Sequence, residues 1–362
     1  MMYLGVEVGS LLLKKFFPRS KVLGKFTNLF IMKNICVIGG SGFVGTRLIN
    51  LLLQRNYMYC TSNLDKDISL THSNLTTLAD VRNLNQLAAI PKGSVIVNLA
   101  AEHRDDVRPL SLYDDVNVQG AKNICEVARK KMVSTIIFTS SVAVYGFAPV
   151  DTDEGGKIAP FNDYGRTKFE AEMVFKQWQS EDPLSRSLVI IRPTVIFGEG
   201  NRGNVYNLLR QIVSGNFMMI GSGKNRKSIA YVENVAAFIE HSIRFGPGIH
   251  TYNYIDKPDF SMNEFVASVR RILGRSEKIG FRLPYFIGFA IGKGFDLVAA
   301  VTGKRLAVSS IRVKKFCADS AYNTAINETG FIPPVPLAQA FEKTILHEFI
   351  EKHDDMLLYF SE

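Results

Sequence analysis

The chain has 362 residues, of which 46% are hydrophobic, and its formal net charge is +9. This length and composition exclude a disordered protein and allow one large hydrophobic core or two unequal ones. The four cysteines (Cys36, Cys60, Cys125 and Cys317) lack the close spacing of zinc ligands or of a disulfide framework. We therefore expect a globular protein of a reducing compartment, without a metal.

The excess positive charge lies in two segments that are also rich in apolar residues. Residues 1–34 contribute +5 and residues 278–318 contribute +7. Basic and apolar residues in alternation suit an anionic membrane surface better than a nucleic acid, although a solvated, partly packed face gives the same pattern. No run reaches roughly 20 apolar residues without charge. We therefore expect the segment from Pro284 to lie on a membrane rather than to cross it.

Residues 1–31 form a basic and apolar N-terminal extension. Their apolar stretch follows no basic residue and precedes no small-residue cleavage site, so it does not resemble a secretory signal. Because Met32 directly precedes the first clear strand, the extension is either an amphipathic segment or the product of an upstream start codon.

From residue 34 onward, short apolar runs alternate with helical patterns. Strands are predicted near residues 34–40, 57–65, 94–101, 134–141 and 187–198, and helices near residues 43–55, 113–131 and 164–179. Nearly continuous apolar strands separated by helices are typical of a parallel sheet covered on both faces. The sequence therefore predicts the α/β class, a doubly wound parallel sheet with a smaller C-terminal domain over its crevice.

A glycine-rich turn follows the first predicted strand. The stretch IGGSGFVG spaces Gly39, Gly42 and Gly45 three residues apart, and Phe43 and Val44 open the following helix. Such a turn allows positive φ, lets a diphosphate approach the backbone and aims a helix N-terminus at it. Packing alone also produces glycine-rich turns, but the strand, turn and helix context favours a bound dinucleotide.

Four further positions are candidates for contacts with this dinucleotide. Asp65 ends the second strand, where a carboxylate accepts hydrogen bonds from ribose hydroxyls and repels a 2′-phosphate. The alternative is a solvated loop aspartate. Asp80 and Val81 are placed to flank the adenine, and Ala100 follows the fourth strand. The sequence therefore predicts an NAD-binding Rossmann domain over residues 32–200, with part of 230–256, and a mainly substrate-binding domain over 201–362.

The stretch YGRTK places Tyr164 four residues before Lys168 on a predicted helix. An ammonium on the same helix face stabilises a phenolate, which can then accept a proton from a sugar hydroxyl. In isolation, such a pair is more often an ordinary feature of a helix surface. The preceding strand ends in FTSSVAVYG, which supplies hydroxyl groups one strand earlier.

The order of these motifs resembles that of the extended short-chain dehydrogenase/reductase family. The shared features are the glycine turn, NLAA, Asn117 in VNVQG, the serine strand, YxxxK and RPTVIFG, from about residue 33 onward. The resemblance implies that Ser141, or as second choice Ser140, is the catalytic hydroxyl. It also implies that Tyr164 is the acid–base residue, that Lys168 supports it, and that both contact NAD.

The resemblance also bears on the reaction and the substrate. Dehydratases of the family carry an acidic pair after the catalytic hydroxyl, where this chain has Val142 and Ala143. We therefore expect 4-epimerisation, in which C4 of a sugar is oxidised and then reduced from its other face. Asn204 and Lys227 match the region that binds the substrate diphosphate. Lys227 stands where many members have arginine, and a lysine cannot form the bidentate phosphate contact.

A more detailed likeness, through LAAEHRDDV and FTSSVAVYG, is to bacterial epimerases of O-antigen and surface glycan synthesis. These epimerases interconvert N-acetylglucosamine and N-acetylgalactosamine on diphosphoundecaprenol. The likeness implies a peripheral enzyme at the cytoplasmic face of the inner membrane, docked through residues 278–318, and a homodimer through helices 113–131 and 164–179. The alternatives are a cytoplasmic UDP-GlcNAc or UDP-glucose 4-epimerase, a 4-keto-sugar reductase, and a non-catalytic NAD-sensing protein.

Overall fold

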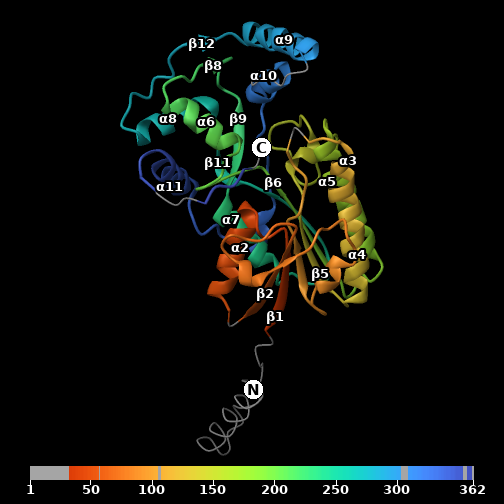
Figure 1. The fold of residues 1–362 in the computed structure, drawn as a ribbon. Helices are drawn as coiled ribbons and strands as arrows, with labels where there is room; N and C mark the ends of the chain where they lie inside the picture. The colour runs from red at the N-terminus through yellow and green to blue at the C-terminus, as the bar shows by residue number, and fades with distance from the viewer. Residues whose placement is uncertain (1–31, 57, 105–106, 303–308, 354–356, 361–362) are drawn as a thin grey trace, which may run out of the picture.

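The computed structural model describes residues 32–56, 58–104, 107–302, 309–353 and 357–360. The expectation for the N-terminal extension therefore lies outside the described residues. Over the described ranges, a large layered α/β structure carries a smaller group of helices and short strands at one end (Figure 1).

The larger part is built on a seven-stranded parallel sheet, which confirms the predicted fold class. Its strands are β1 (Lys33–Ile38), β2 (Tyr59–Asp65), β3 (Thr76–Leu78), β4 (Val95–Asn98), β5 (Thr135–Thr139), β6 (Ser187–Pro193) and β10 (Gly248–Tyr254). Their order in the sheet is β10, β6, β5, β4, β1, β2, β3, so the direction of winding reverses between β1 and β4. Loops leave the sheet in opposite directions at this reversal and open a crevice at the carboxyl ends of the strands.

Helices cover both faces of the sheet (Figure 1). One face carries α2 (Phe43–Gln54) and α7 (Val232–Ser242), and the other carries α3 (Ser111–Tyr113), π-helical η4 (Asp114–Gln119), α4 (Gly120–Lys130) and α5 (Asp163–Ser180). Successive strand residues point to opposite faces. Accordingly, Ile35 and Val37 of β1 pack in the core beneath α2 and α7, whereas Cys36 and Ile38 pack beneath α4 and α5.

The apolar run predicted as one strand over residues 187–198 forms two strands in different sheets. β6 ends at Pro193, and β7 (Val195–Phe197) pairs with β9 (Arg226–Tyr231) of the smaller part. Pro193 has no N–H to continue the ladder with β10. The backbone N–H of Thr194 donates to Tyr254 O at 3.1 Å and closes the end of the large sheet. The run therefore carries the chain from one part of the molecule to the other.

The smaller part combines two short sheets with helices. Its remaining strands are β11 (Asp256–Ser261), β8 (Met219–Ile220) and β12 (Arg282–Leu283), and its helices are α6 (Asn204–Val213), α8 (Met262–Ile272), α9 (Tyr285–Thr302), α10 (Ser310–Cys317) and α11 (Leu337–Phe349). Leu209, Val266 and Phe341 form the centre of its own hydrophobic core, between α6, α8 and α11. Within the described ranges, the 3₁₀ turns are η2 (Ser73–Leu75), η3 (Gln86–Ala89), η5 (Val142–Tyr145) and η6 (Ile326–Thr329).

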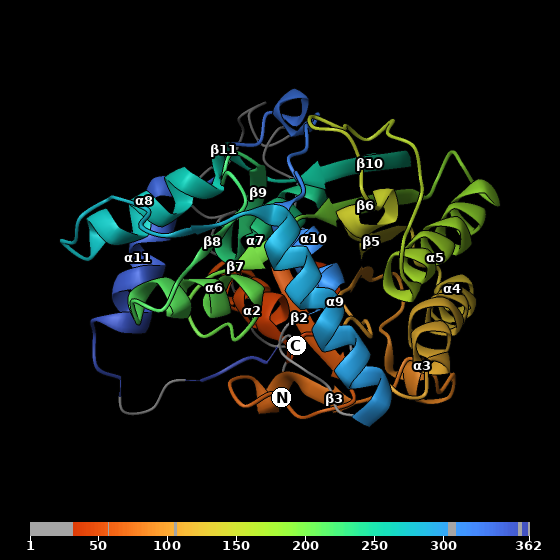
Figure 2. The ribbon, with the colours of Figure 1, turned by 90° about the horizontal axis from the view of Figure 1, so that it is seen from above.

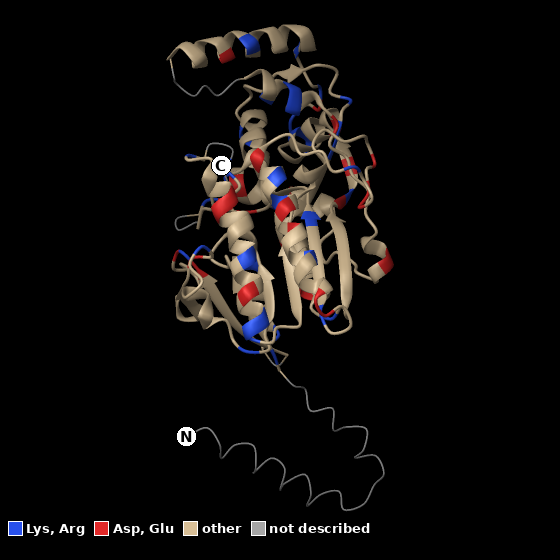
Figure 3. Cartoon of the chain, turned by 90° about the vertical axis from the view of Figure 1, so that its right-hand side faces the viewer, with Lys and Arg blue, Asp and Glu red and all other residues tan. Residues whose placement is uncertain are grey.

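Helix α9 stands apart from the rest of the smaller part. It lies with α10 beyond the carboxyl ends of the large sheet (Figures 1 and 2). Its 18 residues have a mean hydropathy of 1.4 and only 11% of them are buried. By length and composition alone this helix is apolar enough to cross a membrane, and it contains Lys293 and Asp296. In Figure 3 it is the helix at the top, with one basic and one acidic residue.

Candidate functional site

The glycine turn between β1 and α2 is shaped by two close contacts and one open position. Gly39 has a φ of +81°, and a Cβ there would lie 2.6 Å from Ala100 N. A Cβ on Gly45 would lie 2.4 Å from the Cα of Gly40, so only glycine lets α2 approach the turn. At Gly42 a Cβ would meet nothing closer than 3.6 Å. The turn thus combines tight packing at two glycines with an open approach at the third, which fits a dinucleotide diphosphate.

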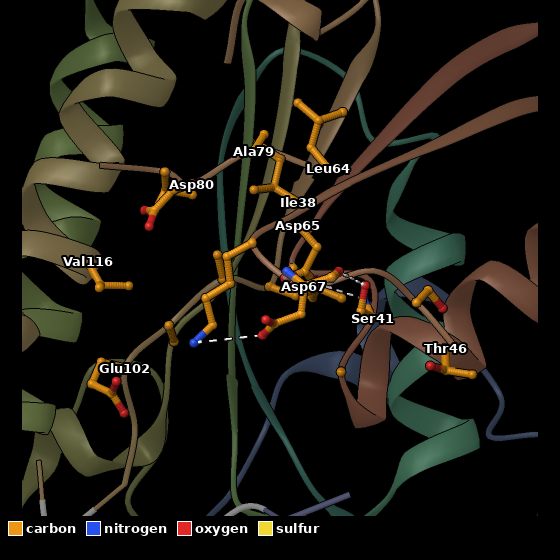
Figure 4. A pocket seen from close by; sticks show the side chains of 18 of the residues that line it. Ile38, Ser41, Thr46, Leu64, Asp65, Asp67, Ala79, Asp80, Glu102 and Val116 are labelled. Carbon is orange, nitrogen blue, oxygen red and sulfur yellow. Dashed lines mark hydrogen bonds and ion pairs between the residues drawn. The ribbon is translucent and has the colours of Figure 1, made fainter. Parts of the chain in front are cut away.

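A pocket of about 650 Å³ opens beside this turn. Figure 4 shows Asp65 and Ser41 on one side of it and Asp80 on the other. The Asp65 carboxylate accepts hydrogen bonds from Ser41 N at 2.9 Å and from Asp67 N at 3.3 Å. These contacts fix a carboxylate at the end of β2, next to the glycine turn, where ribose hydroxyls can reach it.

Asp80 and Val81 also line the pocket, on the loop after β3. Arg82 donates to the Asp80 carboxylate at 2.5 Å, and this hydrogen bond holds the pKa of Asp80 below its usual range. Val81 is buried against Gly120 at the start of α4. The two residues therefore offer a fixed anion and an apolar side chain at the wall predicted for the adenine.

Phe43 and Val44 do not line this pocket. The Phe43 ring packs 5.6 Å from the ring of Tyr359, and Val44 packs into the hydrophobic cores beside α2. Their side chains are turned away from the pocket because α2 begins at Phe43 and its first turn faces the C-terminal segment. For these two residues, only the backbone N–H groups at the helix start are suited to a diphosphate.

Sequence reasoning missed a further part of the wall, residues 357–359. The Tyr359 hydroxyl donates to Thr46 Oγ1 of α2 at 2.9 Å. The Tyr359 backbone bonds to Gly200 O at 2.9 Å and to Arg202 N at 2.8 Å. No motif marks this segment, and only the fold brings it to the glycine turn.

Tyr164 and Ser141 are carried by two elements that touch. Ser141 caps η5, and its Oγ accepts a hydrogen bond from Ala143 N at 3.1 Å. Tyr164 is the second residue of α5, which begins after the N-cap Asn162. A Cβ on Gly165 would lie 2.4 Å from Ala143 O. The glycine inside YGRTK thus lets the start of α5 lie directly against the turn that carries Ser141.

Lys168 ties the same helix to the strand before Ser141. Its Nζ donates to Thr139 O, at the end of β5, at 2.7 Å and lies 4.8 Å from the centre of the Phe138 ring. The residue is only 3% exposed. Burial lowers the pKa of Lys168 to about 7, and the nearby Glu172 carboxylate opposes this shift. Its charge therefore depends on its neighbours at physiological pH.

Asn117 lies on the π-helical segment η4 beneath Tyr164's helix. Its side chain accepts from Glu102 N at 2.9 Å and donates to Glu102 O and to Thr167 Oγ1, each at 3.0 Å. π-Helical turns inside helices are frequent at functional sites. Through these hydrogen bonds, η4 joins the loop after β4 to α5. The sequence predicts one helix over residues 113–131 and does not reveal this π-helical turn. His103, on the same loop, lines the pocket.

The two residues assigned to the substrate diphosphate lie in different settings. Asn204 is exposed at the first position of α6. Lys227 of β9 points into the end of α10, where its Nζ donates to Lys315 O at 2.9 Å and to Ala318 O at 2.6 Å. Burial lowers the pKa of Lys227 to about 8. A diphosphate would have to replace these carbonyl contacts, so Lys227 is better placed to anchor α10.

Comparison with known proteins gives relatives along almost the whole chain. The N-acetyl-α-D-glucosaminyl-diphospho-ditrans,octacis-undecaprenol 4-epimerase of Escherichia coli O157:H7 is 47% identical over 332 residues, 91% of this chain and 99% of that protein. The UDP-glucose 4-epimerase of Vibrio cholerae is 28% identical over 330 residues, 86% of this chain and 94% of that protein.

Solved structures of related enzymes share the fold. The UDP-glucose 4-epimerase of Thermotoga maritima, with UDP-glucose, has a TM-score of 0.67 and 19% identity over 87% of this chain and 98% of that one. The UDP-glucuronic acid 4-epimerase of Bacillus cereus, in complex with NAD, has a TM-score of 0.66 and 18% identity over 87% and 98%. Residues 35–254, more than half of the chain, match the family model. The protein therefore belongs to the NAD dependent epimerase/dehydratase family, which confirms the resemblance read from its motifs and the expected cofactor, NAD.

Proposed function

We propose that this protein is an NAD-dependent 4-epimerase that interconverts N-acetylglucosamine and N-acetylgalactosamine carried on undecaprenyl diphosphate. The observation that carries the substrate is the 47% identity, over nearly the full length of both chains, to the E. coli enzyme named for that lipid-linked sugar. In this proposal the protein acts in O-antigen or surface glycan synthesis. The reaction type is supported by the close approach of α5, which carries Tyr164 and Lys168, to the turn that carries Ser141.

In this proposal Ser141 and Tyr164 handle the C4 hydroxyl of the sugar. The Ser141 hydroxyl hydrogen-bonds the C4 oxygen and orients it. The Tyr164 phenolate takes the hydroxyl proton, and the Lys168 ammonium stabilises that phenolate. Bound NAD supplies the hydride acceptor and later the hydride donor. The 4-keto sugar then rotates so that its opposite face receives the hydride. Tyr164 returns its proton to the C4 oxygen, and the configuration at C4 is inverted.

Two features favour epimerisation over the other reactions of the family. Val142 and Ala143, the first residues of η5, leave no acid or base where dehydration would need one. The return of the hydride to the sugar makes the reaction redox neutral, so a retained NAD suffices. A 4-keto-sugar reductase, in contrast, would consume stoichiometric NADH or NADPH.

The substrate test compares two sugars. We expect the purified enzyme to convert GlcNAc-diphosphoundecaprenol in detergent without added NADH and to leave UDP-GlcNAc unchanged. Chromatography of the released sugars measures both reactions. Turnover of UDP-GlcNAc alone would overturn the lipid-linked substrate and favour a soluble UDP-sugar epimerase.

We also propose peripheral membrane contact, which is supported by the outward-facing apolar side chains of α9. Gly292 and Asp296 of α9 face inward: a Cβ on Gly292 would lie 2.8 Å from Ser310 Cα, and the Asp296 carboxylate accepts from Ser310 N at 3.3 Å. Large apolar residues face outward, with Phe286, Leu297 and Val301 exposed by 71%, 68% and 79%. A helix at the surface of a soluble domain has the opposite arrangement.

The charges of the segment fit an anionic surface. The acid of α9, Asp296, is turned toward α10, whereas Lys293 is exposed and lies 5.7 Å from the Phe289 ring. A lysine stem along an apolar face lets its ammonium reach lipid headgroups. Because α9 is also held to α10 along its inner face, we propose that it lies in the plane of the cytoplasmic leaflet of the inner membrane.

Replacing the outer apolar residues of α9 should release the protein from membranes. A triple variant with Phe286→Ser, Leu297→Ser and Val301→Ser loses three apolar side chains. Full burial of each such side chain contributes roughly 1.5–3 kcal/mol of free energy. We expect at least a ~100-fold weaker partition into vesicles of phosphatidylcholine and phosphatidylglycerol, measured by co-sedimentation. Activity on detergent-solubilised substrate should persist.

The matched control replaces exposed apolar residues elsewhere, with Leu184→Ser and Ile332→Ser. This control should sediment like the wild type. Unchanged sedimentation of the α9 variant would rule out this surface. Alkaline carbonate extraction separates the remaining possibilities, because it releases an in-plane helix and leaves a crossing helix in the membrane pellet.

We also propose a homodimer. α4 and α5 form the outer layer on one face of the sheet (Figure 1), and Met173 of α5 remains 49% exposed there. A two-fold contact between two copies would cover this surface. Light scattering in detergent tests the dimer, and a monomer mass would reject it.

A further inference from the structure

A buried carboxylate lies one helical turn after Lys168. Glu172 of α5 is 0% exposed. Its Oε1 accepts from Ser140 Oγ at 2.5 Å and from Arg192 Nε at 2.8 Å, and its Oε2 accepts from Arg192 Nη2 at 2.6 Å. Burying a carboxylate is costly unless it is paired and hydrogen-bonded, and here both oxygens have partners.

The partner of this carboxylate belongs to a network that reaches across the sheet. Arg192 of β6 is 3% exposed, and its Nη1 donates to the Tyr145 hydroxyl at 2.7 Å and to Glu154 O at 3.3 Å. The Tyr145 hydroxyl donates in turn to Asn253 Oδ1 of β10 at 2.8 Å. The network therefore joins α5 to η5, β6 and β10, the elements around the serine turn.

Two contacts of Glu172 lead directly to the proposed catalytic groups. Ser140, which donates to Glu172, is the residue before Ser141. The Glu172 carboxylate also raises the pKa of Lys168 against the larger lowering effect of burial. The other titratable groups near Lys168 are Tyr164 on the same helix and His103 on the loop after β4, which interacts with it electrostatically.

We propose that Glu172 is a positioning residue of the reaction: it holds Ser140, and with it the Ser141 turn, against α5, and its negative charge favours the protonated form of Lys168. The hydrogen bonds set the geometry of the serine turn, and the charge sets the state of the ammonium. This inference goes beyond the proposed substrate, because it applies to any sugar whose proton Tyr164 removes.

The direction of the effect follows from the charges. With Glu172 in place, burial lowers the pKa of Lys168 to about 7, and the ammonium loses its proton as the pH rises through this value. Without the carboxylate charge, the buried ammonium loses its proton at a lower pH. The neutral amine no longer attracts the phenolate, so Tyr164 ionises only at a higher pH. The pH range in which Lys168 is protonated and Tyr164 is ionised therefore becomes narrower.

The test uses Glu172→Gln in the full-length, NAD-loaded enzyme, with two measurements. The first is the pH dependence of kcat/KM on GlcNAc-diphosphoundecaprenol, whose alkaline limb should move down by about one pH unit. The second is the ultraviolet absorbance of tyrosinate as a function of pH, from which the same titration in the Tyr164→Phe background is subtracted. We expect the Tyr164 signal to move to higher pH.

The matched control is Glu170→Gln, which removes an acid from the same helix. Glu170 is partly exposed and receives a hydrogen bond from Arg166 at 3.0 Å. Both titration curves of this variant should coincide with those of the wild type. A shift equal to that of Glu172→Gln would mean that any acid on α5 has this effect, and it would overturn the proposal.

A second variant guards against misfolding, because Glu172→Gln leaves Arg192 without its ion pair. Glu172→Met combined with Arg192→Met replaces the buried pair by apolar groups, a change that proteins often tolerate. The shifts should persist in this double variant. Reduced thermal stability with unshifted titrations in both variants would reduce Glu172 to a structural role. If the wild type does not turn over the lipid-linked sugar, the proposed function fails, but the tyrosinate titration still decides this inference.

Discussion

Replacement of Tyr164 by phenylalanine should reduce epimerisation about 10²- to 10⁴-fold, the usual contribution of one acid–base group. The change removes a single hydroxyl and leaves the ring, so the helix and the contact between Gly165 and Ala143 remain. NAD should stay bound, because the glycine turn and Asp65 are unchanged. Initial rates on the lipid-linked sugar and the NAD content of the denatured protein measure the two effects.

The control for this prediction is Tyr252→Phe. Tyr252 lies on β10, where its ring packs 5.6 Å from the ring of Phe238 in the core beneath α2 and α7. Its variant should keep the wild-type rate. A Tyr164→Phe enzyme that retains more than a tenth of the wild-type rate would show that another group removes the proton. Loss of NAD together with activity would instead indicate a fault in the cofactor site.

Gly165→Ala should reduce kcat/KM by more than tenfold, although alanine is the better helix former. The added methyl group would lie 2.4 Å from Ala143 O and 3.0 Å from the Pro160 Cβ, so the start of α5 must move away from η5. This movement separates Tyr164 from Ser141, and small displacements of reacting groups are costly in rate. Rates on the lipid-linked sugar measure the loss of activity, and circular dichroism measures the helix content separately.

A second helical glycine provides the control. Gly294 of α9 has nothing within 4 Å of its Cβ position, so Gly294→Ala gains roughly 1 kcal/mol of helix propensity without a clash. Its activity in detergent should be unchanged. Full activity in Gly165→Ala would show that the close approach of α5 to the serine turn is not required for the reaction.

Local spacing made a large part of the fold and site predictable. The glycine turn and YGRTK are defined by residues within one or two turns of the chain, and the apolar strands between them set the parallel sheet. The split of residues 187–198 was not predictable from apolar composition, because β6 and β7 are both rich in apolar residues but pair in different sheets. Pro193 is the local signal that marks the boundary.

Contacts between distant segments explain the other differences. Lys227 matches a diphosphate position in the sequence, yet the carbonyls of Lys315 and Ala318 occupy its ammonium. Tyr359 reaches Thr46 without any motif around it. Glu172 reads as one more charged residue on a helix until the fold brings Arg192 beside it. Partners of this kind are set by tertiary packing, which spacing along the chain does not encode.

The position of residues 357–359 beside the glycine turn has a consequence for how the enzyme is made. During translation the glycine turn and β1 leave the ribosome early, whereas the pocket wall supplied by Tyr359 leaves it last among the described parts of the site. A nascent chain that has folded its sheet still lacks this wall. The complete pocket therefore forms only after residues 357–359 have been synthesised, and a chain that ends before residue 357 lacks this wall.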